Sequence, residues 1–487
     1  MKKFMLAMGG VFLTTLVMLS GVEAFAQNEI DALRYSQLRY GGTARFTAMS
    51  GAFGALGGDF GVLSINPAGI AIYRRSEFTF TPSFYNSKTT SNFKGNSLDD
   101  YKYNVNFNNA GIVLSYYEPE TKNAWKGIMF GFGYNRLNNF NNRVSMTGKN
   151  SDNSLLDIYV NDAQSANGDT SAMDPFGTQL ALNSSAIFLD TSNGTFYHHL
   201  QGIYGQEQSK EVTSSGAMGE TVFTLGGNYN DKLYMGATIG IPHIRYTEES
   251  NYSETADTAY NTFKSFELNQ TSRTTGVGFS FKFGMIYKPV DWVRVGGAVH
   301  SPTYFQMHDD WSSSMTTHFG SYSDGYAESP SGLYDYSLVT PMRTIGSIGF
   351  VIKKMGLVGI DYEFVDYPAA SLSSSKYKYM TENKAIRERY MEGNNIRFGT
   401  EWKLAPMSLR AGVAYYGSPY KKTVGNDGSR MDYSAGIGFR DENFFLDFAY
   451  VLSQTSDNYY FYDASMISPS ENTSRSSSVL MTLGFKF

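Results

Sequence analysis

Short runs in which apolar residues alternate with small or polar ones recur along most of this 487-residue chain. In the first such run Phe78, Phe80 and Phe84 are separated by Thr and Ser residues. The pattern returns in residues 128–134, 277–283, 396–404 and 431–439. A period of two places successive side chains on opposite faces of a strand. Each run therefore predicts a β-strand with one apolar face and one small or polar face.

The lengths of the connections distinguish a membrane barrel from a soluble β-sandwich, which would also alternate. Six short connections, for example residues 230–232 and 440–443, interleave with seven long ones, for example residues 86–103 and 138–214. Thirteen connections join about 14 antiparallel strands, an even number as in bacterial outer-membrane barrels. The sequence thus predicts an all-β, closed antiparallel transmembrane barrel with short periplasmic turns, long outer loops and both chain ends on the periplasmic side.

Composition agrees with this fold class. Charged residues make up 17% of the chain, against roughly 25% in soluble domains, while Tyr and Phe number 36 and 35. Beyond residue 20 no run is long and apolar enough for a membrane-spanning helix. The formal net charge of −5 argues against nucleic acid as a partner. The absence of cysteine is compatible with an oxidising compartment.

The two ends of the chain predict the compartment. Lys2 and Lys3 precede an apolar stretch over residues 4–19, and Ala24-Phe25-Ala26 has the form of a signal-peptidase site. We therefore expect a signal peptide over residues 1–26 and a mature chain that starts at Gln27. The alternating C-terminal run ends on Phe487, which resembles the signal read by the barrel-assembly machinery. The bacterial cell outer membrane is the predicted location, with its lipid and that machinery as partners.

Residues 41–73 interrupt the strand pattern before the first strand. They are rich in Gly, Ala and Ser, and they end in the turn sequence Asn66-Pro67-Ala68-Gly69. We expect residues 27–75 to fold back into the lumen as a plug, or hatch, and residues 76–487 to form the barrel. A phosphate-binding loop at Gly51, Gly54 and Gly57 is disfavoured, because neither the spacing nor a preceding strand fits.

Three stretches resemble the FadL/TodX type of outer-membrane transporters of long-chain fatty acids and hydrocarbons. Asp59 followed by Asn66, Pro67, Ala68 and Gly69 matches the hatch motif of that family. Residues 284–302 and residues 395–419 resemble two of its barrel hairpins. The resemblance implies a 14-stranded barrel, a lumenal hatch and passive uptake of hydrophobic molecules such as long-chain fatty acids. It also implies a sideways exit through a gap made by a kinked third strand.

The third strand would cover residues 125–137, with Gly127, Gly131 and Gly133 on its small face. These glycines either permit the kink or make room for the hatch, and the sequence leaves both interpretations open. The long outer loop over residues 138–214 is expected at the outer mouth, with a disordered loop as the alternative.

A hydrophobic solute would need a dry pocket in the lumen. Arg294, Arg397 and Arg410 face inward in the predicted register, where each would pair either with a fatty carboxylate or with structural partners such as Glu401, Asp432 or hatch groups.

No catalytic residue, cofactor or metal is predicted, and the chain is expected not to be an enzyme, since no Ser, His and acidic residue stand at an interpretable spacing. One alternative is a haem receptor that uses the neighbouring pair His198 and His199 in the long outer loop. Another is a structural or adhesive barrel without transport.

Overall fold

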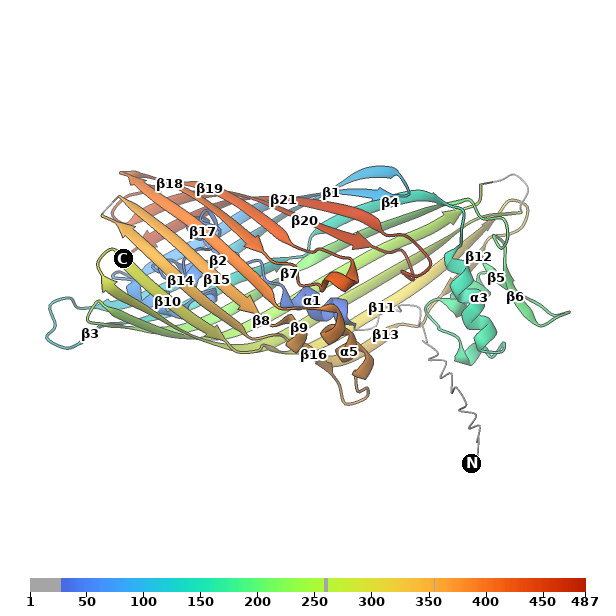
Figure 1. Cartoon of the computed structure of the whole chain (residues 1–487), viewed down its shortest axis with the longest axis horizontal. Coiled ribbons are helices and arrows are strands. Elements are labelled where there is room, and N and C mark those ends of the chain that lie inside the picture. The colour runs from blue at the N-terminus through green and yellow to red at the C-terminus, as the bar shows by residue number, and fades with distance from the viewer. Residues whose placement is uncertain (1–27, 258–261, 354) are drawn as a thin grey trace, which may run out of the picture.

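The computed structural model describes residues 28–257, 262–353 and 355–487, so the predicted signal peptide lies outside the described residues. These residues form a closed antiparallel β-barrel, in which β1 (Glu77–Phe93) pairs with both β2 (Asn96–Tyr117) and the C-terminal β21 (Ser470–Lys486) (Figure 1). The main sheet contains nineteen strand segments. Because several wall strands are divided into shorter segments, these segments form a barrel wall of fourteen strands. The predicted fold class is confirmed.

Several wall strands are made of two consecutive pieces, which is why nineteen strands give fourteen. The interrupted pairs are β3 (Trp125–Asn139) with β4 (Asn142–Asn150), β10 (Val293–His300) with β11 (Tyr304–Phe319), β13 (Gly332–Val339) with β14 (Arg343–Ile352), and β15 (Gly356–Val365) with β16 (Ser371–Ser373). The short β12 (Gly325–Glu328) adds to the end of β11. The remaining strands are β7 (Gln206–Tyr229), β8 (Leu233–Thr255), β9 (Phe263–Val290), β17 (Gly393–Leu404), β18 (Met407–Tyr416), β19 (Arg430–Arg440) and β20 (Phe444–Tyr459).

The outer surface of the wall is a belt of exposed apolar side chains. It includes Phe78, Phe80 and Phe84 on β1 and Phe279, Phe281 and Phe283 on β9. In each of these strands the alternate side chains are buried toward the lumen. Exposed aromatic rings on every second position of a closed barrel are stable against lipid, and in this barrel they place the chain in an outer membrane. Among the described residues, no helix is long and apolar enough to cross a bilayer.

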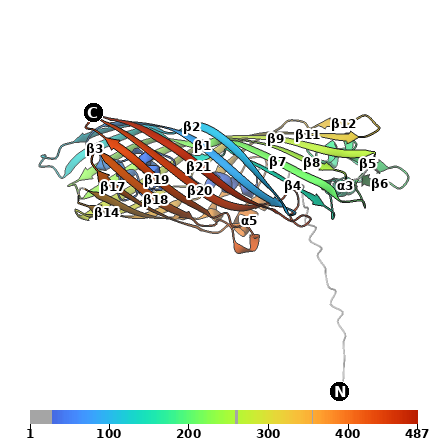
Figure 2. The same cartoon turned by 90° about the horizontal axis from the view of Figure 1, so that it is seen from above.

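The two ends of the barrel differ. Short turns and the C-terminus gather at one end, and the opposite end carries α3 (Leu155–Ser165), β5 (Ile187–Asp190) and β6 (Thr195–His198) (Figures 1 and 2). Short turns mark the periplasmic end. On the outer side β7, β8, β9 and β11 continue beyond the apolar belt with polar side chains facing outward, as Glu249 and Thr271 do.

The predicted loop over residues 138–214 is a folded outer domain that begins with β4 and ends within β7. It contains α3, η3 (Thr170–Ala172), α4 (Thr178–Asn183), β5 and β6. Buried apolar side chains such as Leu156, Tyr159 and Leu180 pack against Phe263, Phe266 and Met315 of the extended strands. The outer domain is therefore held on the extended barrel strands by a shared hydrophobic core.

The chain before β1 lies inside the barrel. It forms α1 (Glu29–Ser36), α2 (Ala44–Thr47), η1 (Phe60–Ser64) and η2 (Pro67–Ile72), and most of its side chains are buried. The helix α1 packs against α5 (Met380–Arg389), which belongs to an outer connection with η4 (Tyr367–Ala369), and the Tyr390 hydroxyl donates to the Glu29 carbonyl at 3.0 Å. The expectation that both ends lie on the periplasmic side is wrong for the described N-terminal end, because the hydrophobic face of α1 is buried in the outer half of the lumen.

Candidate lumenal cavity and wall opening

Inside the lumen, residues 41–73 lie against glycines on the wall strands. A Cβ atom on Gly236 of β8 would lie 2.3 Å from the Pro67 carbonyl oxygen, and one on Gly359 of β15 would lie 2.1 Å from the Ala52 oxygen. The same close approach recurs around the barrel at Gly111, Gly131, Gly133, Gly226, Gly284, Gly296, Gly349, Gly399, Gly412 and Gly436. At Gly236, Gly296, Gly359, Gly399 and Gly412 the contact is with the backbone of residues 41–73, and at the other positions it is mainly with side chains; in both cases only a residue without a side chain leaves enough room. Residues 41–73 are called the plug below.

The residues of the predicted hatch motif shape the plug internally. Asp59 accepts a hydrogen bond from the Gly61 amide at 2.9 Å and from the Thr43 hydroxyl at 2.8 Å, and so caps η1. Asn66 caps η2 through the Ala68 amide at 3.1 Å, and its side-chain nitrogen donates to the Gly54 carbonyl at 2.6 Å. Pro67 occupies the first turn of η2, where a missing N–H costs nothing.

The third wall strand, β3, stops pairing with its neighbour β2 before it reaches the outer end of the barrel. β2 and β3 pair from Tyr117↔Gly127 as far as Asn109↔Asn135, and no further. At this level Asn108 is the extra residue of a β-bulge in β2, since Thr81 pairs with Asn109 but Pro82 pairs with Phe107. β3 itself stays paired with β7 as far as Asn139. The wall is therefore interrupted between the upper part of β2 and the end of β3.

Above this interruption the strand moves inside the barrel as β4. The side chains of Ser87 and Thr89 face the lumen on β1, and both donate to the Asn142 side-chain oxygen, at 2.8 and 3.0 Å. Asn142 is the first residue of β4. β4 thus lies behind the β1–β2 hairpin and not beside it. The segment that we call the wall opening is bounded by Asn106 and Asn108 on β2 and by Arg136 and Asn138 on β3.

A stretch of the N-terminal segment takes over the hydrogen bonds that β2 no longer makes. The amide of Arg39 donates to the Leu137 carbonyl at 2.7 Å, and the amide of Gly41 donates to the Arg136 carbonyl at 2.8 Å. The Asn138 side chain donates to the Gln37 carbonyl at 3.0 Å. Backbone groups freed at the edge of a membrane sheet need such partners. The N-terminal segment therefore borders the wall opening from within.

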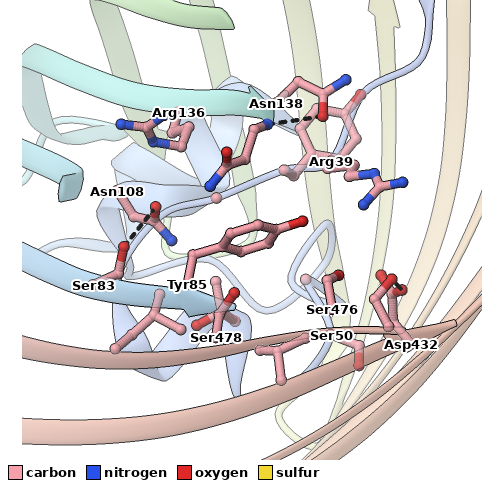
Figure 3. Close-up of a pocket in the computed structure, with 18 of the residues that line it drawn as sticks. Arg39, Ser50, Ser83, Tyr85, Asn108, Arg136, Asn138, Asp432, Ser476 and Ser478 are labelled. Atoms are coloured by element: carbon pink, nitrogen blue, oxygen red, sulfur yellow. Dashed lines mark hydrogen bonds between the residues drawn. The ribbon is translucent and has the colours of Figure 1, made fainter. Parts of the chain in front are cut away.

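A cavity lies between this segment, the top of the plug and the inner wall. Its floor includes Thr47, Ser50 and Gly51, and its sides include residues of β1, β2, β3, β18, β19, β20 and β21. Figure 3 shows Tyr85 reaching into it, with Arg39 and Arg136 on one side and Ser476, Ser478 and Asp432 on the other. All four residues that bound the wall opening also line the cavity. A second cavity, which shares Arg39, Tyr85, Asn139, Ser453 and Ser476, continues toward Asp457.

The first cavity carries more positive than negative charge. Arg39 and Arg430 line it together with a single carboxylate, Asp432, and Arg136 lies at its edge, where its side chain donates to the Phe107 carbonyl of β2. Arg430 is buried, stacks on Tyr416 at 3.7 Å from the ring centre and has its Nε atom 3.1 Å from Asp432 Oδ1, but its Nη2 atom has no hydrogen-bond partner. Within the part of the chain that the structure describes, the Arg39 guanidinium makes no ion pair. Such an arrangement can hold an anion.

The three arginines predicted from sequence lie elsewhere in the lumen. Arg397 pairs with Glu363 at 2.9 Å, Arg410 pairs with Glu401 at 2.6 Å and with Asp447 at 2.7 Å, and Arg294 donates to the Leu56 carbonyl of the plug. All three therefore have partners in the barrel or the plug. Their role in binding a ligand stays a prediction, and none of them lines the cavity.

The structure bears on two further expectations, the nature of the lumenal pocket and the role of the glycines on β3. The lining of the cavity is mixed: Ser and Asn occupy most inward positions of β1, β2, β20 and β21 at this level, while Tyr85, Tyr416 and Leu480 supply apolar surface, so the expected dry pocket stays a prediction. Gly131 faces Ile70 and Leu63 of the plug, and Gly133 faces Phe60. The third strand turns inward from the barrel wall at residues 139–142, which lie on the outer side of these glycines.

The histidine pair of the outer domain is held by neighbouring groups. His198 Nε2 lies 2.9 Å from Asp157, and its Nδ1 accepts from the Leu200 amide at 3.3 Å. The His199 ring stacks on Phe263. In the described ranges no group of three or more His, Asp or Glu residues is arranged to hold a metal ion.

The architecture defines a class: outer-membrane β-barrels with an N-terminal segment packed inside the lumen. No protein-family model matches the sequence, and no curated protein matches it. Solved structures do match. A FadL homologue from Pseudomonas aeruginosa is similar over 93% of this chain and 100% of its own, with a TM-score of 0.53 and 12% identity. The toluene transporter TodX from P. putida is similar over 92% and 99%, with a TM-score of 0.53 and 11% identity. The resemblance to this type of barrel is confirmed at the level of the fold.

Proposed function

We propose that the protein is a passive outer-membrane channel for small hydrophobic and amphiphilic molecules. In this proposal a ligand enters the lumen from outside, rests in the cavity and leaves sideways through the wall opening. The support from comparison is that the same fold is found in a FadL homologue and in a toluene transporter. The observation that carries the proposal is that the four residues bounding the wall opening also line the cavity.

The plug supports a sideways route over an axial one. It contacts the backbone of most wall strands and is tied to them by polar bonds, such as the Gly54 amide to Asp361 at 3.0 Å and the Ala44 amide to Thr482 at 2.6 Å. A straight path to the periplasm would require all these contacts to break together. The wall opening needs no such change, since β2 and β3 are already apart above Asn109 and Asn135.

The charge of the cavity favours an amphiphile that carries an anionic group, of which a long-chain fatty acid is one example. Within the described residues Arg39 makes no ion pair, and Arg430 keeps an unbonded Nη2 donor beside its pair with Asp432. Charge-assisted hydrogen bonds to a carboxylate contribute about 1.5–3 kcal/mol each. Tyr40, Tyr85, Tyr416 and Leu480 supply apolar surface beside the two arginines. Removing an alkyl tail from water contributes about 0.8 kcal/mol per CH₂.

The route is tested by altering the β2 edge of the wall opening, where Asn108 is both the bulge residue and part of the cavity lining. Deleting Asn108 removes the bulge residue and lets β2 pair regularly with β1. We expect this variant to keep its fold and to lose most uptake of labelled dodecanoate by cells that carry it in an intact outer membrane. A matched deletion of Lys122, in the exposed turn between β2 and β3, should leave uptake unchanged. Full uptake by a folded Asn108 deletion would reject the sideways route.

The ligand class is tested separately by binding to the detergent-solubilised protein. Arg39→Gln together with Arg430→Gln should weaken dodecanoate binding at least tenfold and leave 1-dodecanol binding nearly unchanged. Lys376→Gln, at an exposed outer position, is the control. An equal loss of binding for dodecanoate and 1-dodecanol would show that the arginines do not recognise an anionic group.

A further inference from the structure

Four basic side chains gather on the outward face of the barrel beside the wall opening. They are Arg136 on β3, His243 and Arg245 on β8, and Arg273 on β9, and we call them the basic patch. The strand register brings them together: Gly219 of β7 pairs with both Arg136 and His243, Ala217 pairs with Arg245, and Thr247 pairs with Arg273. Paired strands lie about 4.8 Å apart, so the four side chains share one region of the surface.

The basic patch begins where the apolar belt ends. On β8 the outward side chains Ile239 and Ile241 are followed by His243 and Arg245, and on β9 Phe279 and Val277 are followed by Thr275 and Arg273. On β3 Phe132 and Tyr134 are followed by Arg136. All three changes occur toward the outer end of the strands. The basic patch therefore lies at the depth of the lipid head groups of the outer leaflet.

The cations of the basic patch lack the carboxylate partners that most lumenal arginines have. Across the described ranges Arg245 and Arg273 form no ion pair, and Arg136 donates only to the Phe107 carbonyl, at 3.1 Å. Two acidic residues lie at the outer margin: Asp310 stands opposite Arg273 on β11, and Glu249 follows Arg245 along β8. Neither is ion-paired with the basic patch, so its centre keeps a positive charge.

Between the arginines of the basic patch, strand β7 presents the small residues Gly219 and Ala217. Gly219 carries no side chain, and the ring of Tyr134 lies over it, since a Cβ there would be 2.3 Å from the Tyr134 hydroxyl. The Tyr134 and His243 rings are 5.6 Å apart. Ala217 continues this small-residue strip outward. A head group therefore has room to sit between Arg136 and Arg245, with its acyl chains on Tyr134 and Ile241 below.

We infer that the basic patch binds a phosphate-bearing lipid of the outer leaflet. Arginine presents a planar fork of donors that matches phosphate oxygens, and several arginines at head-group depth form a recognition site for anionic lipid. Because Arg136 also lines the cavity, the bound lipid stands at the edge of the wall opening. The inference concerns the outer surface and does not depend on the proposed transport.

Native mass spectrometry of the detergent-solubilised protein with added bisphosphorylated lipid A tests this inference. We expect the double variant Arg245→Gln/Arg273→Gln to bind lipid A at least tenfold more weakly than the unaltered protein. The control Lys122→Gln/Lys232→Gln removes the same charge from exposed periplasmic turns and should bind normally. Unaltered binding by the arginine variant, or an equal loss in the control, would overturn the site.

A second arm tests the chemistry of the head group. The unaltered protein should bind lipid A at least tenfold more tightly than the same lipid with both phosphates removed. Equal binding of the two lipids would show that the arginines merely extend to water at the membrane edge and do not recognise phosphate. Heat-modifiable migration on gels verifies that each variant is folded, so a loss of binding is not a loss of the barrel.

Discussion

Arg45 of the plug and Glu401 of β17 form a two-pronged ion pair inside the barrel. Arg45 Nε lies 2.7 Å from Glu401 Oε2, and Arg45 Nη2 lies 3.2 Å from Oε1. Glu401 also accepts from Arg410, which continues to Asp447 at 2.7 Å. The plug is thus the first member of a chain of alternating charges that runs through the wall.

Removing Arg45 should loosen the plug and spare the barrel. In Arg45→Met, Glu401 keeps Arg410 as its partner, so the wall stays compensated while the plug loses its anchor. Breaking a buried pair of this kind costs about 3–5 kcal/mol. We expect a lower midpoint of unfolding in lipid vesicles and more current noise in planar bilayers. Lys384→Met, which breaks an exposed pair with Glu388, should change neither. A wild-type midpoint for Arg45→Met would contradict the anchoring role.

Glu401→Gln should be more harmful than Arg45→Met. This change leaves both Arg45 and Arg410 without their shared carboxylate, and two buried guanidinium groups then face one another across the plug boundary. The expected order of unfolding midpoints is unaltered protein, Arg45→Met, then Glu401→Gln. The reverse order would show that Glu401 serves the plug alone and is not needed by the wall.

Adding one methyl group at a wall glycine should displace the plug. Gly359→Ala places a Cβ 2.1 Å from the Ala52 carbonyl oxygen, a distance that the backbone must relieve by moving. Gly346→Ala on β14 is the matched control, because no atom lies within 4 Å of its added Cβ. We expect Gly359→Ala to cost about 1–3 kcal/mol and to raise ion conductance, while Gly346→Ala does neither. Equal conductance of the two variants would mean that the plug adapts without opening.

The outer domain should lose protection in acid. Asp157 accepts from His198 at 2.9 Å, from Tyr204 at 2.8 Å and from the Ser154 amide at 2.7 Å. Burial alone would raise the pKa of Asp157, but these hydrogen bonds together lower its pKa below the ordinary value. A lowered folded pKa gives stability above the unfolded pKa near 3.9, and this stability is lost as the pH falls through the folded value.

Hydrogen exchange of the outer domain, corrected for intrinsic rates, measures this effect. Asp157→Asn should open locally more often at neutral pH, by about 1–2 kcal/mol, because it removes the reciprocal cap of α3. It should also lack the acid step below pH 4. Asp152→Asn, at an exposed position beside Lys94, should behave like the unaltered protein. An acid step that persists in Asp157→Asn would assign it to another group.

The sequence predicts this fold well because a membrane barrel requires apolar and polar residues to alternate along each strand, and this alternation is visible in the sequence. Residues 41–73 have neither a strand nor a helix pattern, which leads us to expect that they enter the lumen, and their sealing of the barrel stays a prediction. Outside the membrane this alternation is not required, and there the sequence underestimates the length of the strands. The outer parts of β7, β8 and β9 carry polar side chains, so residues 206–214 and 248–255 look like loop although they are strand.

The candidate site depends on strand pairing and on contacts between distant segments, which cannot be inferred from the local sequence. β3 leaves β2 above Asn135, and the break at residues 139–142 contains no Gly or Pro to signal a bend. The cavity is assembled from seven wall strands and the N-terminal segment, and the pairing of Arg397 with Glu363 requires the register of β15 and β17. One signal was available and missed: a glycine at the inward position of most strands, which marks the level of the plug.

Removing the plug should convert the barrel into an open pore. Without residues 41–73 the inner wall at this level is formed by glycines such as Gly236, Gly359 and Gly412, which leave the bore wide, and by charges such as Asp361 and Glu401, which hold water in it. We therefore expect a deletion of residues 41–73 to raise single-channel conductance well above that of Gly359→Ala, and to admit small hydrophilic solutes in liposome-swelling assays. A deletion of residues 187–198, which removes the β5–β6 hairpin of the outer domain, should leave conductance unchanged, because that hairpin lies outside the bore. If the plug deletion conducts no better than the unaltered protein, another part of the chain closes the lumen and the glycine contacts described above do not seal it.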